Sequence, residues 1–206
     1  MLDLFYRGGP VMYPLLFCSL LSLTLIIERL LFWMREEGNR DRKLLTRFME
    51  LIEKNDLTEA KEMTKDTRDF VIRVIVCGIV HREFSLRDAL QMSADEEIGR
   101  MRKYLPILDT MITLAPLLGI LGTVIGIIRS FNMLGTIGVE NPGMITAGIG
   151  QALITTAFGL IIAIFALIPF NYFQSRVDTA VGEMEKYGTN LEIIVEKNKN
   201  GADSKP

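Results

Sequence analysis

Long uncharged stretches separated by charged segments dominate the pattern of apolar and polar positions along the chain. Residues 8–27, 110–128 and 141–175 contain no charged side chain. A helix needs about 20 apolar residues to cross a hydrocarbon core ~30 Å thick, so each stretch is long enough to span a bilayer. A small soluble core does not need three such stretches. The pattern therefore predicts an all-α, polytopic membrane protein with three transmembrane helices.

The positions of lysine and arginine predict how these helices are oriented. Most of the chain's 23 basic residues lie in residues 35–103, and more follow Gln174. The segment before Val11 contributes only Arg7, and residues 132–143 contribute none. Basic residues accumulate in the cytoplasmic loops of membrane proteins. We therefore expect a periplasmic N-terminus, a cytoplasmic C-terminus and a long cytoplasmic loop.

The uncharged stretches and the basic residues together divide the chain into successive segments. The predicted segments are a periplasmic N-terminal segment (1–10), transmembrane helix 1 (11–34), a cytoplasmic helical loop (35–103), transmembrane helix 2 (104–131), a periplasmic loop (132–143), transmembrane helix 3 (144–173), a cytoplasmic amphipathic helix (174–197) and a disordered tail (198–206). The spans are thus expected to extend into a cytoplasmic helical bundle.

The cytoplasmic segments carry helical patterns of their own. We expect loop helices near Asp41–Lys54, Asp56–Asp66 and Phe70–Arg82, and a helix that starts near Ser85 and continues into the second span. After the third span, apolar residues recur at spacings of three and four, which makes one helical stripe. The stripe consists of Phe173, Val177, Val181, Met184, Tyr187, Leu191 and Ile194. It must pack against the loop helices or against a copy of itself.

Few residues are available for covalent chemistry or for metal binding. The chain has two cysteines, Cys18 and Cys77, and one histidine, His81. These residues cannot form a disulfide framework or a zinc site, and the sequence holds no catalytic motif or phosphate-binding loop. The net charge of -2, without a basic patch, argues against nucleic-acid binding. We expect no enzyme activity, no cofactor and no metal site.

The second and third spans each present a face of small and weakly polar residues. Small residues let helix backbones approach closely, and hydroxyl or amide groups can bond across helices. The second-span face holds Gly119, Gly122, Thr123 and Gly126, and the third-span face holds Ala147, Gly148, Gln151, Ala152, Thr155, Thr156 and Gly159. These faces either hold the helices together or line a pathway. Asp109 is the only acid well inside a span, and we interpret it as an interfacial charge near the cytoplasmic border. The chain alone therefore has no obvious proton carrier at mid-membrane.

Three motifs give the sequence a resemblance to a known family. The first span opens with Gly8-Gly-Pro-Val-Met-Tyr-Pro14 and closes with Glu28-Arg29. The second span holds Leu114-Ala-Pro-Leu-Leu-Gly-Ile-Leu-Gly-Thr-Val-Ile-Gly126, and the third holds Gly148-Ile-Gly-Gln-Ala-Leu-Ile-Thr-Thr-Ala-Phe-Gly159. Together these motifs resemble the MotA/TolQ/ExbB proton-channel family, and most closely its ExbB/TolQ branch.

The resemblance implies a ring-forming subunit, typically of a homopentamer, embedded in the lipid of the bacterial inner membrane. Spans two and three would face the centre of the ring. They would surround the single-span helices of an ExbD/TolR-like partner, whose aspartate carries the proton. The proton motive force would then energise TonB-type outer-membrane transport or Tol-type envelope maintenance, with a TonB- or TolA-like protein as a further partner.

The resemblance also assigns roles to individual residues. Thr123 and Thr156 correspond to the family's pore threonines, and we place Thr155 and Gln151 with them in the expected proton pathway or partner-facing surface. The residues expected to pack the helices are Pro116, Gly119, Gly122, Gly126, Gly148, Ala152 and Gly159. The motifs fit ExbB and TolQ equally, and they leave open whether the ion is a proton or sodium.

Gln151 departs from the pattern of the better-known members. It stands where many ExbB and TolQ proteins carry a glutamate, and a glutamine cannot take up and release a proton. If that glutamate were an obligatory relay, this chain could not conduct. Otherwise Gln151 tunes hydration or partner contact. The alternative function is a non-conducting membrane scaffold that assembles a partner complex.

Overall fold

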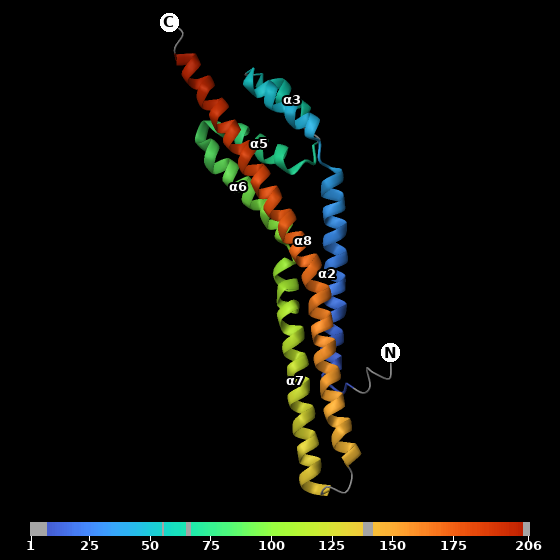
Figure 1. Ribbon diagram of the computed structural model, residues 1–206. Coiled ribbons are helices and arrows are strands. Elements are labelled where there is room, and N and C mark those ends of the chain that lie inside the picture. The colour runs from blue at the N-terminus through green and yellow to red at the C-terminus, as the bar shows by residue number, and fades with distance from the viewer. Residues whose placement is uncertain (1–7, 55, 65–66, 138–141, 204–206) are drawn as a thin grey trace. The chain divides into compact units, whose positions relative to one another are not determined.

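The computed structural model describes residues 8–54, 56–64, 67–137 and 142–203, and almost all of them are helical (Figure 1). The helices are α2 (Met12–Gly38), α3 (Arg42–Glu53), α4 (Leu57–Met63), α5 (Phe70–Val80), α6 (Arg82–Arg102), α7 (Leu105–Ile137) and α8 (Pro142–Asp203). Stretches of α2, α7 and α8 are long and apolar enough to cross a membrane. The prediction of an all-α protein with three such helices is confirmed.

The chain forms two compact units, each built from two parts that are distant in the sequence. The membrane unit comprises residues 1–29 and 104–173, and the polar unit comprises residues 30–103 and 174–206. The unit boundaries fall within α2 and α8 and between α6 and α7. The predicted periplasmic segments lie partly outside the described residues, at 1–7 and 138–141.

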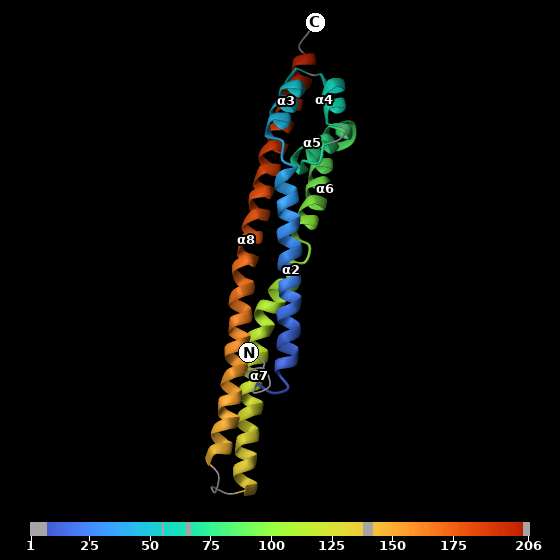
Figure 2. The ribbon, with the colours of Figure 1, turned by 90° about the vertical axis from the view of Figure 1, so that its right-hand side faces the viewer.

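The membrane unit consists of α7 and the first parts of α2 and α8, which run alongside one another (Figures 1 and 2). One core cluster joins Met12 and Leu15 of α2 to Ala115 of α7. A second cluster joins Leu25 of α2 to Leu108 of α7 and Ala166 of α8. The outer surface is apolar as well, with exposed side chains that include Phe17, Leu20, Leu121, Phe131, Phe165 and Ile168. An apolar exterior of this kind fits contact with lipid or with other subunits.

The expected helix start at Ser85 is confirmed, because Ser85 interrupts α6 with a non-helical backbone and its Oγ accepts a hydrogen bond from the Asp88 N–H group at 3.2 Å. The expected continuation into the second span is wrong, because α6 and α7 are separate helices. α6 ends at Arg102 and α7 begins at Leu105, and Tyr104 between them has a φ of 69°. This left-handed backbone conformation is rare for a residue with a side chain. In a continuous helix the ring of Pro106 would clash with the carbonyl group of Arg102, whereas the first turn of a new helix tolerates a proline.

The polar unit consists of α3 to α6, the end of α2 and the rest of α8. From Val177 onward the apolar stripe of α8 lies in this unit, where Val177 and Leu191 are 0% exposed and Met184 is 3% exposed, while Val181, Tyr187 and Ile194 are half-buried. Near the end of α8, the Asn198 side chain donates a hydrogen bond to the Ile52 carbonyl oxygen of α3 at 3.3 Å. The stripe therefore packs against the loop helices, the first of the two partners that its sequence allowed.

α8 continues beyond the end expected from the sequence. The sequence predicts a helix to residue 197 and a disordered tail over 198–206, but α8 extends to Asp203. Residues 204–206 lie outside the described part of the chain. The segment after residue 197 contains no helix-breaking residue before Gly201, and the hydrogen bond from Asn198 fastens it to α3. At its other end α8 begins at Pro142, because the missing N–H of a proline costs nothing in the first helical turn.

Candidate functional site

α7 and α8 approach each other closely in the membrane unit, and this approach depends on glycines. A Cβ atom on Gly119 would lie 2.9 Å from the Thr156 Cα atom, and one on Gly159 would lie 2.5 Å from the Ala115 carbonyl oxygen. Both obstacles are backbone atoms, which cannot rotate aside. A side chain at either position would therefore force the two helices apart.

The same contact continues toward the other end of the two helices. A Cβ atom on Gly126 would lie 2.8 Å from the Ala152 Cβ atom, and one on Gly122 would overlap the Thr155 hydroxyl. These positions include most of the residues to which the sequence assigns helix packing. The small-residue faces of the second and third spans thus meet each other within one subunit.

Two adjacent threonines of α8 have different surroundings. Thr155 is 1% exposed, and its Oγ1 donates to the Ala152 carbonyl oxygen at 2.7 Å. Thr156 is half-buried, and its Oγ1 donates across the interface to the Gly119 carbonyl oxygen at 2.9 Å. Thr155 therefore lies inside the helix interface, whereas Thr156 lies at its edge with part of its side chain accessible.

Thr123 of α7 lies on the same side of the helix pair as Thr156. It follows Gly119 by four residues, so it is one turn farther along the same side of α7. Thr123 is half-buried as well, and its hydroxyl donates to the Ile120 carbonyl oxygen. The structure thus gives the two threonines that resemble pore residues a shared, partly accessible edge.

Two other residues expected at this site add less to its geometry. Pro116 is half-buried inside α7, and the helix continues through it. Gln151 lies in α8, but its side chain is outside the described part of the structure. Its assignment to the pathway stays a prediction.

Sequence reasoning missed two residues of this interface, Ala115 and Ser130. Ala115 is 0% exposed and opposes Gly159, and the Ser130 hydroxyl fills the space beside Gly148. Each lies four residues from a glycine of the second-span motif, Gly119 for Ala115 and Gly126 for Ser130. Extending the four-residue spacing of small residues by one step in each direction would have found both.

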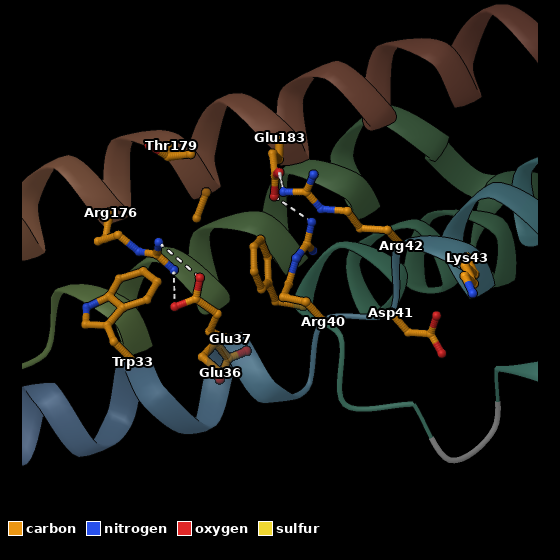
Figure 3. A pocket seen from close by; sticks show the side chains of 12 residues that line it. Trp33, Glu36, Glu37, Arg40, Asp41, Arg42, Lys43, Arg176, Thr179 and Glu183 are labelled. Atoms are coloured by element: carbon orange, nitrogen blue, oxygen red, sulfur yellow. Dashed lines mark hydrogen bonds and ion pairs between the residues drawn. The ribbon is translucent and has the colours of Figure 1, made fainter.

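The polar unit holds a pocket of about 520 Å³ between the end of α2, α3 and α8 (Figure 3). Arg40 lies in it, with Nη1 2.7 Å from Asp69 Oδ1 and Nη2 2.6 Å from Glu183 Oε2. Arg176 Nη2 of α8 lies 3.3 Å from Glu37 Oε2 of α2. Arg40 and Arg176 are thus paired with carboxylates, and these ion pairs join α8 to the end of α2 and to the segment before α5. Among the described residues, no group of three or more His, Cys, Asp or Glu could hold a metal ion.

A second charge cluster in the polar unit links α2, α5 and α6. Glu97 Oε1 lies 2.8 Å from Arg73 Nη2, and Glu97 Oε2 lies 2.9 Å from Arg100 Nη2. Arg100 also reaches Glu36 Oε1 at 2.9 Å. Burial raises the pKa of Glu97 above its ordinary value of 4.5, although the two arginines beside it act in the opposite direction. The native state therefore holds a proton on Glu97 more tightly than the unfolded chain does.

Glu97→Gln is expected to change how stability depends on pH. The charged form of Glu97 costs stability, and this cost disappears as the pH falls through the raised pKa of the native state toward 4.5. The melting temperature of the unmodified chain should therefore rise relative to that of the variant as the pH falls from 7, and level off below 4.5. Melting curves in detergent at several pH values measure this. A difference that moves the other way would show that the arginines outweigh burial.

Comparisons with known proteins place this geometry in a family. Residues 60–186, more than half of the chain, match the MotA/TolQ/ExbB proton channel family. An ExbB-like biopolymer transport protein of Synechocystis is 40% identical over 204 residues, which cover 94% of this chain and 78% of that protein. Biopolymer transport protein exbB1 of Vibrio cholerae is 30% identical over 183 residues, which cover 86% of this chain and 80% of that protein. TolQ of Pseudomonas aeruginosa is 31% identical over 115 residues, which cover 56% of this chain and 50% of that protein. The resemblance seen in the motifs is confirmed, and the chain belongs to the MotA/TolQ/ExbB proton channel family.

Proposed function

We propose that this chain is the ring-forming subunit of a proton-driven stator in the bacterial inner membrane. Together with an ExbD/TolR-like single-span partner, it uses the proton motive force to energise TonB-type outer-membrane transport or Tol-type envelope maintenance. The observation that carries this proposal is the shared, partly accessible edge that the α7–α8 glycine contact gives to Thr123 and Thr156. Members of the family are transport proteins rather than enzymes, in line with the prediction from the residue inventory.

The hydrogen bonds of the two threonines suit a protonated partner. Thr156 donates its hydroxyl proton to the Gly119 carbonyl oxygen, and Thr123 donates to the Ile120 carbonyl oxygen. A hydroxyl that donates elsewhere still has lone pairs that accept a hydrogen bond. Each threonine can therefore accept from a protonated carboxylic acid or from an ordered water. An ionised carboxylate cannot donate, so it gains a bond from these hydroxyls only if they give up their bonds to the carbonyl oxygens.

A carboxylate on the partner would convert protonation into movement. Its charged form is costly in a low-dielectric interior, so it crosses the apolar zone only when neutral. Protonation from the periplasmic side permits the movement, and loss of the proton on the cytoplasmic side resets the system. The described residues of the α7–α8 contact include no carboxylate, which supports a division of labour between the two proteins.

Relatives and charge distribution support the cellular role and the orientation. The Vibrio cholerae and Pseudomonas aeruginosa relatives are named for biopolymer transport and for the Tol-Pal system. The basic residues of the polar unit support a cytoplasmic location for it, with the N-terminus in the periplasm. Family membership is what supports a homopentamer in this proposal.

Proton flux in proteoliposomes tests the proposal. The chain is reconstituted together with its ExbD/TolR-like partner, in complexes with the partner aspartate intact or changed to asparagine. We expect flux down an imposed gradient only from the complex with the intact aspartate. Flux that is independent of the partner aspartate would contradict the proposal, because the carrier would then lie elsewhere.

A scaffold without conduction is the second candidate, and Gln151 favours it because this position carries no ionisable group. In that case the α7–α8 contact only holds the subunit together while the polar unit assembles a partner. A correctly assembled complex that binds the partner but conducts no protons would establish the scaffold.

A further inference from the structure

Asp109 of α7 is an exposed carboxylate in a segment, residues 104–128, that otherwise carries no charge. It follows Leu108, which is 0% exposed and packs in one cluster with Leu25 of α2 and Ala166 of α8. Asp109 therefore lies level with the packed core of the membrane unit rather than beyond the end of the helices. Residues 110–128, which follow it, carry no charge.

The carboxylate of Asp109 has no bonding partner within the described part of the chain, whereas the hydroxyls beside it are satisfied locally. Thr110 Oγ1 donates to the Pro106 carbonyl oxygen at 2.8 Å, and Thr113 Oγ1 donates to the Asp109 carbonyl oxygen at 3.2 Å. An ionised carboxylate only accepts hydrogen bonds, so the carbonyl groups of its own helix cannot satisfy it. A carboxyl group at this depth needs water, a donor from another protein or a proton.

Asp109 shares its face of α7 with Thr113 and Thr123, and also with the exposed Ile120 and Ile127. A helix turns by about 100° per residue, so both threonines lie within about 40° of Asp109 around the axis. Thr123 is about 21 Å farther along that axis. A pathway that follows this face from the threonine edge toward the predicted cytoplasmic end of α7 therefore reaches Asp109.

α2 presents a different surface at the same depth. Its exposed side chains near Leu25 are Leu23 and Ile27, at 55% and 49% exposure, with Thr24, whose hydroxyl bonds to its own helix. That surface suits lipid. The face of α7 with Asp109 does not, because an ionised side chain in contact with lipid is costly. The contrast indicates that this face of α7 is turned toward water or protein.

We propose that Asp109 is a proton-binding group of this chain at the cytoplasmic end of the conduction pathway. This inference rests on the proposed function. The carboxylate takes up a proton that arrives along the Thr123 face, becomes a neutral carboxylic acid, and releases the proton to cytoplasmic water. Only an O–H bond forms and breaks. The ring thereby has its own proton site in addition to the partner's aspartate.

Proton flux from substituted complexes tests the role of Asp109. Asp109→Asn keeps the size of the side chain but cannot bind a proton, and it is expected to lower flux about tenfold or more at unchanged assembly. Asp109→Glu should restore most of the flux. The matched control is Asp178→Asn, which neutralises an exposed acid of α8 in the polar unit and should conduct like the unmodified complex. Full flux from Asp109→Asn in a complex that conducts would overturn the role of Asp109 alone. Absence of flux from every complex would instead reject the proposed function.

A labelling experiment tests the position of the side chain without relying on conduction. In a Cys18→Ser, Cys77→Ser background, Asp109→Cys is compared with Ile27→Cys, which is exposed on α2 two residues after Leu25, the residue that packs with Leu108. A membrane-impermeant maleimide on the cytoplasmic side should label the Asp109→Cys variant several-fold faster. Equal or slower labelling would place this face of α7 in lipid and overturn the proposal.

Discussion

Gly159→Val is expected to separate α7 from α8 and to destabilise the subunit strongly. A Cβ atom at this position would lie 2.5 Å from the Ala115 carbonyl oxygen and 3.3 Å from the Gly119 Cα atom. Both are backbone atoms, so relief requires movement of a whole helix. We expect a loss of at least about 2 kcal/mol. For a chain of this length, the melting temperature in detergent should fall by roughly 4–8 °C.

Gly150→Val is the matched control for this prediction. Gly150 also lies in α8, but a Cβ atom there would meet nothing within 4 Å. The two variants change helix propensity by the same amount, so the difference between them isolates the contact with α7. Equal melting temperatures for the two variants would show that the glycine contact does not hold the helices together.

The helices of the polar unit could be located from sequence because their start signals are local. Asp41 and Asp56 accept hydrogen bonds from the backbone N–H groups of Leu44 and Glu59, three residues further on. An aspartate in this position satisfies an N–H group that the first turn leaves free. Such a signal depends only on neighbours in the chain, and the sequence places these helix starts within one residue of the observed ones.

The break between α6 and α7 could not be located in the same way, although its cause is visible in the sequence. Pro106 is compatible with either a kinked continuous helix or a new helix. The positive φ of Tyr104 decides for a new helix, and the Tyr104 ring lies 5.3 Å from the Arg29 guanidinium of α2. That contact joins residues far apart in the chain. A local pattern contains no information about it.

The roles of Thr155 and Thr156 show the same limit at the candidate site. Both fall on the small-residue face of the third span, and periodicity treats them alike. Adjacent positions differ by about 100° around the helix, which is enough to bury one hydroxyl and leave the other at the edge. Which of them is buried depends on how α8 is rotated about its axis relative to α7. That rotation places the Thr156 backbone against Gly119 and the Thr155 side chain against Gly122. The geometry favours packing for Thr155, and its place in the pathway stays a prediction.

Thr156→Val is expected to stop proton flux while the subunit still assembles. Valine has nearly the shape of threonine, so the packing beside Gly119 is kept. The lost hydrogen bond to the Gly119 carbonyl oxygen, 2.9 Å long, costs about 0.6 kcal/mol, the average found for bonds between membrane helices. The oxygen that would accept from a protonated partner is removed altogether. Flux in proteoliposomes with the partner should fall at least about tenfold, with the amount of assembled complex unchanged.

Two further variants separate the hydroxyl of Thr156 from its shape. Thr156→Ser keeps the hydroxyl and should conduct, although it leaves a methyl-sized gap. Thr24→Val makes the same chemical change on α2, where the hydroxyl bonds only to the Leu20 carbonyl oxygen, and should conduct like the unmodified chain. If Thr156→Val conducts fully, the hydroxyl serves only to hold α8 against α7. If Thr156→Ser fails together with Thr156→Val, the pathway requires the methyl group as well as the oxygen.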